Sequence, residues 1–339
     1  MKNHVALFAG MGGFAFATEE LGYKTIWANE IEPLCCDLLE KNFQDIVVNR
    51  KSISDLGAED LAKLPKDIEL LTAGFPCQSF SQAGGDFKAF DDPRGKLFFD
   101  IPRVIDLMPS PPKVVLLENV PIIKSFDNGA LLRTVLNEMR FAGYWVQEKH
   151  AQVLSCATYG GTPQRRERLF VVCVHESHLR NNPFDFQRIP ASPSKDLFQV
   201  VDRSQKLDDE YYLREDNKYF KLISAEAEKN GSERLFQIRR IIARSCPLNS
   251  CPTLTANMGG GGHNVPFVFD DFGLRRLSET ECLVMQGYDP ERLLMPTGIM
   301  KKDLLKMIGN AVSVGTVKAI IAEINTQILC KGGLNVQSD

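Results

Sequence analysis

Short apolar runs alternate with amphipathic stretches through the first half of this chain. The runs are too short for typical helices and are bounded by glycine, proline or polar residues, so they predict buried strands. The predicted strands cover 4–8, 25–29, 46–48, 68–73, 114–117, 144–154 and 168–174, and the clearest helices cover 32–42 and 131–142. Strands that alternate with helices indicate an α/β fold with a mostly parallel sheet covered on both faces.

The pattern weakens in the second half of the chain. Residues 181–218 have little periodicity, and 234–245 could form a short strand or a helix. A helix is expected over 278–286, where Ser278 as N-cap and Glu281 three residues later form a capping box. Another is expected over 314–329. The four glycines 259–262 form either a flexible hairpin loop or a backbone segment that approaches a ligand.

The composition is that of an ordinary globular protein. The 339 residues are 44% apolar and 24% charged, and this length predicts two domains. The chain has no run of eighteen apolar residues and enters its first strand too early to leave room for a signal peptide. Nine scattered cysteines without a Cys-x-x-Cys pair suit reduced thiols, and five histidines form no convincing metal set. We expect a cytoplasmic protein without a membrane span or a metal.

Charge is divided unevenly along the chain. Residues 1–150 carry 16 Lys and Arg against 21 Asp and Glu, a balance of −5, and residues 151–339 carry the remaining 24 against 22, a balance of +2. Arginines cluster at 165–168, 239–244 and 275–276. Such clusters can face phosphates, but on charge alone solvated surface arginines are the simpler interpretation. The composition permits a nucleic-acid partner without showing one.

A glycine-rich turn joins the first predicted strand to the first helix. Gly10, Gly12 and Gly13 let the backbone approach a ligand, and the start of the following helix offers free N–H groups. Glu30 ends the second strand twenty positions after Gly10, where an acidic residue accepts hydrogen bonds from a ribose diol. A tight turn would explain the glycines alone, but together with Glu30 they predict a cofactor that contains adenosine.

A thiol and a carboxyl group follow two further predicted strands. Cys77 lies in Gly74-Phe-Pro-Cys-Gln-Ser-Phe-Ser81, on a loop that does not bury small side chains well. Glu118 follows four apolar residues, where a carboxylate is costly to bury unless it is partnered or protonated. An inert cysteine and a structural ion pair would explain each residue separately. Jointly they predict covalent attack by a thiol beside a proton donor.

Gln164, Arg166 and Arg168 alternate at the start of a predicted strand. If this segment is extended, the three side chains point to one face and could converge on one pocket. Their positive charge could lower the pKa of the Cys77 thiol. In isolation, a solvated cluster of loop charges is the better interpretation.

Eight segments, in order and over most of the chain, carry a family resemblance. They are Phe8-Ala-Gly-Met-Gly-Gly-Phe14, Asn29-Glu30, Gly74-Phe-Pro-Cys-Gln-Ser-Phe-Ser81, Arg94-Gly-Lys-Leu-Phe-Phe99, Glu118-Asn-Val120, Gln164-Arg-Arg-Glu-Arg168, Arg276-Leu-Ser-Glu-Thr-Glu-Cys282 with Met285-Gln-Gly287, and Gly309-Asn-Ala-Val312. Together they resemble the carbon-5 cytosine DNA methyltransferase family. The resemblance implies a Rossmann-like core that uses S-adenosylmethionine, with a smaller, mostly irregular or β target-recognition domain.

The resemblance also implies catalytic roles. Cys77 attacks carbon 6 of a cytosine flipped out of double-stranded DNA, and Glu118 contacts ring nitrogen 3 and the exocyclic amine. Attack makes carbon 5 nucleophilic enough to take the methyl group, and loss of its proton then expels the thiolate. Arg166 and Arg168 surround the flipped base and its phosphate, and Asn119 buttresses the Cys77 loop.

Binding positions follow from the same resemblance. The cofactor site is expected at Phe8, Gly10, Gly12, Glu30, Ile31, Ser52, Ile53, Pro76, Leu97, Asn310 and Val312. DNA contacts are expected at Ser81, Arg165, Thr253 and Gly260. Ser52 and Ile53 depart from the family, whose members often have an acidic residue here to contact the adenine amino group. Ser52 can still hydrogen-bond, and Ile53 can still pack on the ring.

The resemblance divides the chain into a catalytic and cofactor-binding domain (1–177), a target-recognition domain (178–275) and a C-terminal segment that returns to the catalytic domain (276–339). The four glycines then belong to a recognition loop, and a loop over 76–95 closes on the base. We expect a monomeric, prokaryotic DNA (cytosine-5)-methyltransferase that protects DNA from a cognate nuclease. A tRNA cytosine-5 methyltransferase and a non-catalytic DNA-binding relative are the alternatives.

Overall fold

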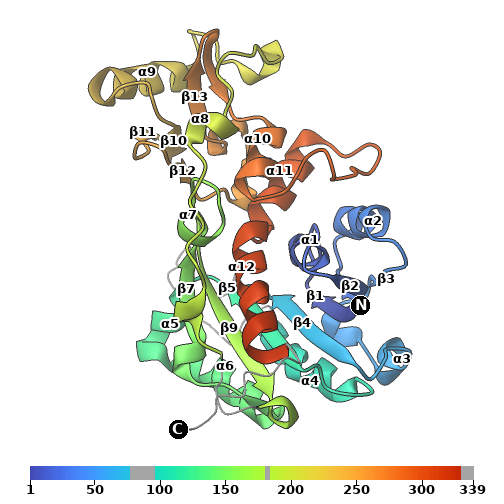
Figure 1. The fold of residues 1–339 in the computed structure, drawn as a ribbon. Helices are drawn as coiled ribbons and strands as arrows, with labels where there is room; N and C mark the ends of the chain where they lie inside the picture. The colour runs from blue at the N-terminus through green and yellow to red at the C-terminus, as the bar shows by residue number, and fades with distance from the viewer. Residues whose placement is uncertain (77–95, 180–183, 330–339) are drawn as a thin grey trace.

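The computed structural model describes residues 1–76, 96–179 and 184–329. Within them, eight strands form one sheet in the order β3-β2-β1-β4-β5-β9-β6, with β7 also paired to β9 (Figure 1). The strands are β1 Lys2–Leu7, β2 Tyr23–Asn29, β3 Val47–Asn49, β4 Ile68–Gly74, β5 Val114–Asn119, β6 Tyr144–Trp145, β7 Ala151–Ser155 and β9 Glu167–His175. Strands β1 to β5 are parallel, whereas β9 is antiparallel to its neighbours β5, β6 and β7. The predicted mostly parallel α/β sheet is confirmed.

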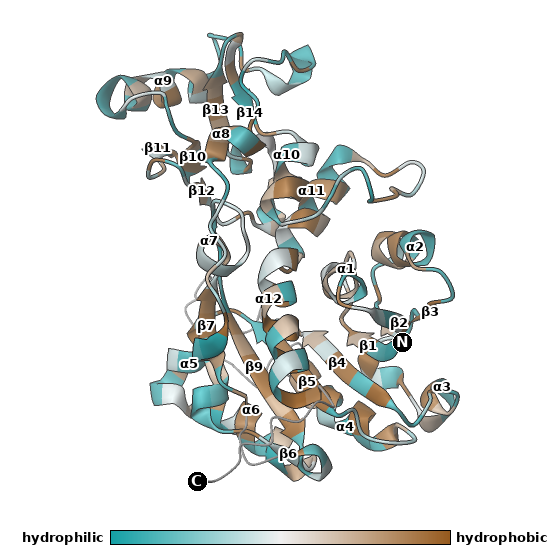
Figure 2. Ribbon diagram, in the orientation of Figure 1, coloured by the Kyte–Doolittle hydropathy of each residue, from teal (hydrophilic) through white to brown (hydrophobic). Residues whose placement is uncertain are grey.

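Helices cover both faces of this sheet, which explains why most residues of its middle strands are apolar (Figure 2). Val114 and Leu116 of β5 join a core with α1 and α12, and Val115 and Leu117 join a second core with α4 and α6. The helices of the first face are α1 Gly13–Glu19, α2 Pro33–Asn42 and α12 Val314–Ile324, and those of the second are α4 Asp100–Leu107 and α6 Ala130–Phe141. Short helices α3 Ala58–Leu61, α5 Ile122–Ser125 and α7 Cys156–Tyr159 lie in the connections.

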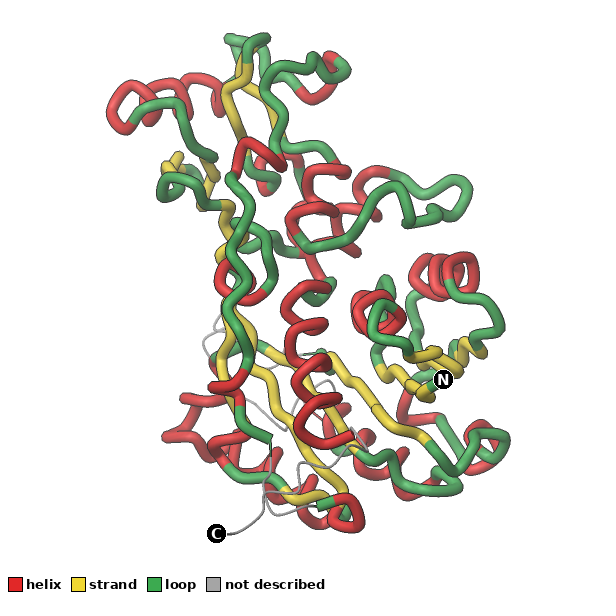
Figure 3. Tube along the Cα trace, viewed as in Figure 1, coloured by secondary structure: helices red, strands yellow, loops and turns green. Residues whose placement is uncertain are grey.

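A second, smaller sheet forms the upper part of the molecule in Figure 3. Its strands are antiparallel and lie in the order β11-β10-β13-β14. They are β10 Phe236–Arg239, β11 Ile242–Ser245, β13 Phe267–Asp270 and β14 Gly273–Arg276, accompanied by helices α8 Leu197–Val200 and α9 Lys218–Asn230. Ile223 of α9 packs with Phe236 and Phe267 in a small core of its own. The undecided segment 234–245 is therefore a β-hairpin.

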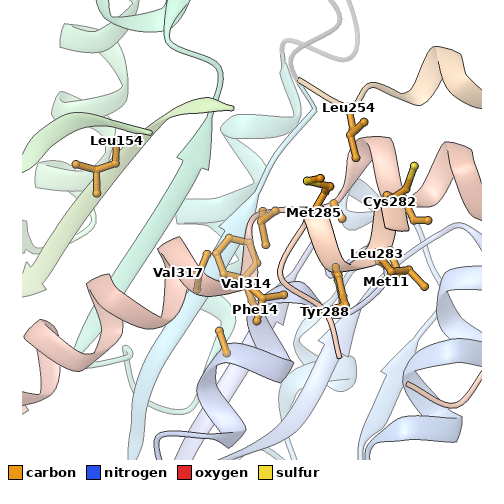
Figure 4. Packing of buried hydrophobic residues seen from close by; sticks show 14 of the residues in the cluster. Met11, Phe14, Leu154, Leu254, Cys282, Leu283, Met285, Tyr288, Val314 and Val317 are labelled. Atoms are coloured by element: carbon orange, nitrogen blue, oxygen red, sulfur yellow. The ribbon is translucent and has the colours of Figure 1, made fainter. Parts of the chain in front are cut away.

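Three helices carry the chain from the small sheet back to the large one. They are α10 Glu279–Met285, α11 Lys301–Asn310 and α12. Phe14 of α1 and Val314 and Val317 of α12 lie in the core that the returning helices complete (Figure 4). The capping box predicted from Ser278 and Glu281 is confirmed at the start of α10.

Two predicted elements are wrong in their extent. The strand expected over 144–154 is two strands, β6 and β7, separated by a 3₁₀ turn at Glu148–His150. The helix expected over 314–329 keeps α-helical geometry only to Ile324 and ends in a π-helical turn, Asn325–Leu329.

The stretch Lys301–Leu329 is long and apolar enough to cross a membrane by length and composition, and its most apolar 18-residue window has a mean hydropathy of 1.4. Polar residues interrupt the stretch, so it contains no unbroken run of eighteen apolar residues. Within the structure it is divided between α11 and α12, and 67% of the apolar window is buried. Its apolar side chains are therefore accounted for by the protein core.

Candidate active site

Five predicted site segments meet at one edge of the large sheet. Phe8 follows β1, Glu30 follows β2, Ser52 follows β3 and Pro76 follows β4, while Glu118 lies near the end of β5. Because these strands are parallel, their carboxyl ends share one edge, where α/β folds build their ligand sites. The fold brings together the predicted cofactor positions and Glu118.

Glu118 is buried at this edge. Its Oε1 lies 3.1 Å from Nε of Arg168 in an ion pair. Burial raises the pKa of the Glu118 carboxyl, and the charges of Arg168 and Arg166 oppose that rise. Gly74 is its neighbour on β4, and an ideal Cβ at Gly74 would lie 3.4 Å from Glu118 Oε2. A glycine here leaves room for the carboxyl, which can hold a proton in a dry site.

Asn119 ties the end of β5 to the segment after β4. Its Nδ2 donates to the carbonyl of Phe75 over 3.0 Å, and its Oδ1 accepts from the N–H of Val120 over 2.8 Å. The Phe75 ring packs against Phe98 at 5.2 Å between centroids. Phe75 and Pro76 are thus held beside Glu118. Cys77 and Ser81 lie outside the described residues.

Gln164 and Arg166 are buried and Arg168 is half-buried, whereas Arg165 and Glu167 between them are exposed, so burial alternates as predicted along this segment. The N–H of Arg166 donates to the carbonyl of Gln164 over 2.9 Å, so the chain turns between β8, Gln164–Arg165, and β9. Arg168 reaches Glu118, whereas both Nη atoms of Arg166 donate to backbone carbonyls. Arg166 is 3% exposed, and these bonds leave its Nη atoms committed to the protein.

The glycine-rich turn after β1 is held open by unusual backbone angles. Phe8, Gly10 and Gly12 have φ of +53°, +55° and +83°, and an ideal Cβ at Gly10 would meet no described atom within 4 Å. Strained backbone of this kind concentrates at ligand sites. The N–H of Gly10 donates to Glu30 Oε2 over 2.7 Å, and the N–H of Ile31 donates to Glu30 Oε1 over 2.8 Å. Glu30 therefore holds the turn in place and retains lone pairs for a ligand.

The C-terminal segment closes on the same turn. An ideal Cβ at Gly13 would lie 2.6 Å from Cγ2 of Val312, so the two backbones can approach only with glycine there. Val312 is buried and Asn310 is exposed. On the other side of Glu30, Asn29 Nδ2 donates to the carbonyl of Lys51 over 2.8 Å and fixes the residue before Ser52.

The remaining predicted cofactor residues differ in exposure. Ile53 is buried, Leu97 is half-buried beside Phe98, and Ile31 is 65% exposed. Ser52 precedes a short 3₁₀ helix that begins at Ile53. The backbone N–H of Ile31 binds Glu30 and fixes its position. Its side chain is exposed and is therefore available to cover a ligand.

Three of the predicted DNA contacts, Arg165, Thr253 and Gly260, lie within the described residues. Arg165 is exposed, and Thr253 Oγ1 donates to its carbonyl over 2.5 Å, which joins β8 to the residue that follows β12, Cys251–Pro252. Gly260 is exposed, and an ideal Cβ there would meet no described atom within 4 Å. An ideal Cβ at Gly259 would lie 2.4 Å from the carbonyl of Lys302 in α11. The first of the four glycines is therefore required by packing rather than by flexibility.

Arg275 was expected in a surface cluster with Arg276, but it is fully enclosed. Its Nε donates to Asp270 over 2.7 Å, and its Nη atoms donate to both oxygens of Glu281 over 2.9 Å. Glu281 is also the capping-box residue of α10. The sequence pattern indicated Glu281 only as a capping residue, so its pairing with Arg275 was not predicted.

No group of three or more His, Cys, Asp or Glu that could hold a metal ion occurs within the ranges 1–76, 96–179 and 184–329.

Comparison with known proteins gives consistent matches. A family model for C-5 cytosine-specific DNA methylases matches residues 3–326. The chain is 36% identical over 332 residues to the Type II methyltransferase M.Bsp6I of Bacillus sp. (strain RFL6), over 97% of this chain and 100% of that protein. It is 30% identical over 340 residues to the Type II methyltransferase M.HhaI of Haemophilus parahaemolyticus, over 96% and 94% respectively.

A solved structure shares the fold. The Entamoeba histolytica methyltransferase EhMeth matches with a TM-score of 0.70 at 16% identity, over 96% of this chain and 98% of that one.

Proposed function

We propose, from the premise that this chain belongs to the C-5 cytosine-specific DNA methylase family and methylates carbon 5 of cytosine in DNA, that S-adenosylmethionine is its methyl donor. A methyltransferase of this family needs a donor, and the open turn at Gly10 fits an adenosine-containing one. Glu30 would accept hydrogen bonds from the ribose, and Ile31 and Ile53 would pack on the adenine ring. Ser52 would bind the ring edge. When bound, S-adenosylmethionine supplies an electrophilic methyl group.

The other cofactor positions would complete this cradle. They are Phe8, Gly12, Pro76, Leu97, Asn310 and Val312. The approach of Val312 to Gly13 supports a site closed from two sides. Asn310 is exposed at the same junction and offers an amide to the ligand.

The reaction would proceed through a covalent adduct on a flipped cytosine. The Cys77 thiolate attacks carbon 6, and the electron pair displaced from the ring double bond makes carbon 5 nucleophilic. Carbon 5 takes the methyl group, then loses its proton, and the returning electron pair breaks the bond between sulfur and carbon 6. Without the adduct, an aromatic carbon is too poor a nucleophile for this transfer.

The burial of Glu118 and its raised pKa are the main support for this mechanism. Its raised pKa and its burial beside Phe75 suit a carboxyl that donates a proton to ring nitrogen 3 as carbon 6 is attacked. Arg168 would orient the carboxyl through the 3.1 Å ion pair and face the base and its phosphate. The bonds of Arg166 to backbone carbonyls support a role in positioning other residues.

The biological setting is also proposed. Arg165, Thr253, Gly260 and Ser81 would contact duplex DNA, with Arg165 and Thr253 on its phosphates. A monomer acting in the cytoplasm on chromosomal DNA would protect that DNA from a cognate nuclease. The similarity to two Type II methyltransferases over nearly their full lengths supports this setting.

Labelled S-adenosylmethionine, incubated with the protein and either plasmid DNA or tRNA, tests the proposal. We expect label on plasmid cytosine, none on tRNA, and loss of labelling in the Cys77→Ser variant. Bisulfite sequencing of the plasmid would locate the methylated sites. Label on tRNA alone would favour an RNA methyltransferase, and no label on either substrate would favour a non-catalytic relative.

A further inference from the structure

A buried polar network joins the short strand β8 to the helices α10 and α11. At its centre is Gln164, which has no exposed surface. Its Nε2 donates to the carbonyl of Met285 over 2.8 Å and to Oε1 of Gln286 over 3.2 Å. Gln286 in turn donates from Nε2 to the carbonyl of Ile308 over 2.7 Å. These bonds connect β8 to the ends of α10 and α11.

Gln164 and Arg166 together hold both backbone groups of Leu254, which lies in the segment 253–256, called the recognition segment below. The N–H of Leu254 donates to Gln164 Oε1 over 3.0 Å, and its carbonyl accepts from Arg166 Nη1 over 2.8 Å. The Leu254 side chain is buried and lies near Met285 of α10 (Figure 4). Leu254 directly follows Thr253, the proposed phosphate contact, so movement of Thr253 is constrained by Gln164 and Arg166.

Arg166 also holds both neighbours of a proposed cofactor residue. Its Nη2 donates to the carbonyl of Ala311 over 2.6 Å, and both Nη atoms lie 3.3 Å from the carbonyl of Gly309. Gly309 and Ala311 flank Asn310. One guanidinium therefore links the residue after Thr253 to the two residues around Asn310.

A separate contact joins the same two segments. An ideal Cβ at Gly309 would lie 2.1 Å from the carbonyl carbon of Thr255 and 2.3 Å from the nitrogen of Ala256. The recognition segment thus packs directly on the backbone at the end of α11. The interior is close-packed and its polar groups need partners. A shift of the backbone at Thr255 and Ala256 must therefore be matched by a shift of the backbone at Gly309.

We propose that Gln164 and Arg166 are positioning residues that couple DNA binding at the Thr253 segment to cofactor binding at Asn310. This inference rests on the proposed function, because Thr253 and Asn310 are its proposed contacts. DNA bound at Thr253 restricts the movement of Leu254. Because Arg166 binds the carbonyls of Leu254, Gly309 and Ala311, it then also restricts the backbone around Asn310. Each ligand then tightens the binding of the other by the same factor.

The test measures the dissociation constant of S-adenosylhomocysteine by calorimetry, with and without saturating amounts of a plasmid that the wild-type protein methylates. We expect the plasmid to tighten binding in the wild type. In the Arg166→Lys and Gln164→Met variants, this tightening should shrink by about fivefold or more. The second variant serves if the first does not fold.

Thr162→Val is the matched control. Thr162 Oγ1 donates to the carbonyl of Met285 over 2.9 Å, whereas the bonds to Leu254 and Gly309 come from Gln164 and Arg166, and Gln164 still pairs with the Met285 carbonyl. The control should keep the wild-type ratio of the two dissociation constants. A purely structural role for Arg166 would weaken binding equally with and without plasmid and leave the ratio unchanged.

Three results would overturn the inference. They are an unchanged ratio in both variants, an equal loss in the control, and a wild-type protein in which the plasmid does not tighten binding. Failure of the wild-type protein to methylate any plasmid would instead overturn the proposed function.

Discussion

Glu118 is subject to two opposing effects. Burial removes water from its carboxylate and raises its pKa, and Arg168 at 3.1 Å lowers it. Burial has the larger effect, so the neutral form is favoured relative to a free carboxyl. A proton held at this position is available to a cytosine ring nitrogen only while the pH stays below the raised pKa.

Glu118→Gln should separate catalysis from stability. We expect the single-turnover methylation rate to fall by about 10²–10⁴-fold, the usual contribution of a positioned proton donor. The wild-type rate should also decline as the pH rises through the raised pKa, and the variant should lack that decline. Rates measured between pH 5 and 9 check both expectations. A variant with the wild-type rate and pH profile would remove Glu118 from the mechanism.

The sign of the accompanying stability change is fixed by linkage. Between its ordinary pKa of 4.5 and its raised value, the folded protein keeps the Glu118 proton and the unfolded chain has lost it. Its contribution to stability is complete below 4.5 and is lost as the pH rises through the folded-state pKa. Urea titrations should therefore show the wild type losing stability relative to Glu118→Gln as the pH rises.

Single residues were predictable where strand ends and glycines mark them. Glu118 follows an apolar run. Asn119 binds the carbonyl of Phe75, two residues before Cys77, in the loop that Asn119 was expected to support. Arg166 is buried on the same side of this segment as Gln164, as the alternation predicted, but the residues that it binds were not predicted. Its partners lie 88 to 145 residues away in sequence, where no local pattern can indicate them.

At the scale of elements, the short helix Ala256–Gly260 packs closely on α11. Gly259 and Gly260 are adjacent, and replacement by alanine adds the same methyl group at either position. The surroundings of that methyl group differ between the two positions. A Cβ at Gly259 would lie 2.4 Å from the carbonyl of Lys302, and one at Gly260 would meet no described atom within 4 Å. The pair is therefore a matched test of this contact.

Gly259→Ala should lower the free energy of unfolding by about 1–3 kcal/mol, because the added methyl group overpacks a backbone contact. Gly260→Ala should leave it within about 1 kcal/mol of the wild type, since nothing obstructs the new group and the unfolded chain loses some entropy. Urea denaturation of both variants makes the comparison. Equal stabilities would mean that the four glycines act only as a flexible loop.

The β10–β11 hairpin exposes an arginine-rich turn. Arg240 has φ of +60°, and the adjacent Ile241 is 77% exposed. Burial raises the pKa of the Cys246 thiol, which follows β11, to about 12, and the charges of Arg165 and Arg239 oppose that rise. Within the described part of the chain, Arg239 and Arg240 take part in no ion pair.

Replacing Arg239 and Arg240 together by alanine should weaken plasmid binding and reduce its dependence on salt. Each arginine that neutralises a phosphate contributes about one unit to the slope of log affinity against log salt. Filter binding at several salt concentrations measures the slope. Lys66→Ala removes an exposed charge from the large-sheet part and should leave the slope unchanged. A double variant with the wild-type slope would exclude the hairpin from the DNA interface.

Elements were predictable in proportion to their burial. β4 and β5 are buried on both faces and bounded by glycine or proline, so their positions follow from the sequence. β11 is short and alternates exposed with half-buried residues, and its partner β10 supplies the context that decides its conformation. This is why 234–245 could not be assigned from the pattern alone.

Over the whole molecule, one hydrophobic core extends from the large sheet to the small-sheet side. It contains Phe14 and Val317 as well as Leu254 and Val265. Arg275, with Asp270 and Glu281, forms a fully buried ion network where the small sheet meets α10. The shared core joins segments far apart in sequence, which the sequence pattern could not show, whereas the Arg275 network is local and joins residues five and six positions apart.

Arg275→Met should destabilise the protein by about 3–5 kcal/mol, because it leaves two carboxylates enclosed without a cation. Arg214→Met is the control, since that side chain is 87% exposed and its ion pair with Asp216 spans 3.6 Å. The control should change stability by less than about 1 kcal/mol. Urea denaturation measures both. Similar values for the two variants would mean that the Arg275 network does not hold the small sheet to α10.

Trapping of the covalent adduct tests directly whether Cys77 attacks the cytosine ring. A DNA fragment amplified with 5-fluorodeoxycytidine triphosphate offers the enzyme every sequence with fluorine at carbon 5, which cannot leave as the proton does. With S-adenosylmethionine present, we predict a complex that survives denaturing electrophoresis, with the DNA attached at Cys77 by peptide mass mapping. Methylation of ordinary plasmid without any such complex, or attachment at another residue, would contradict the account.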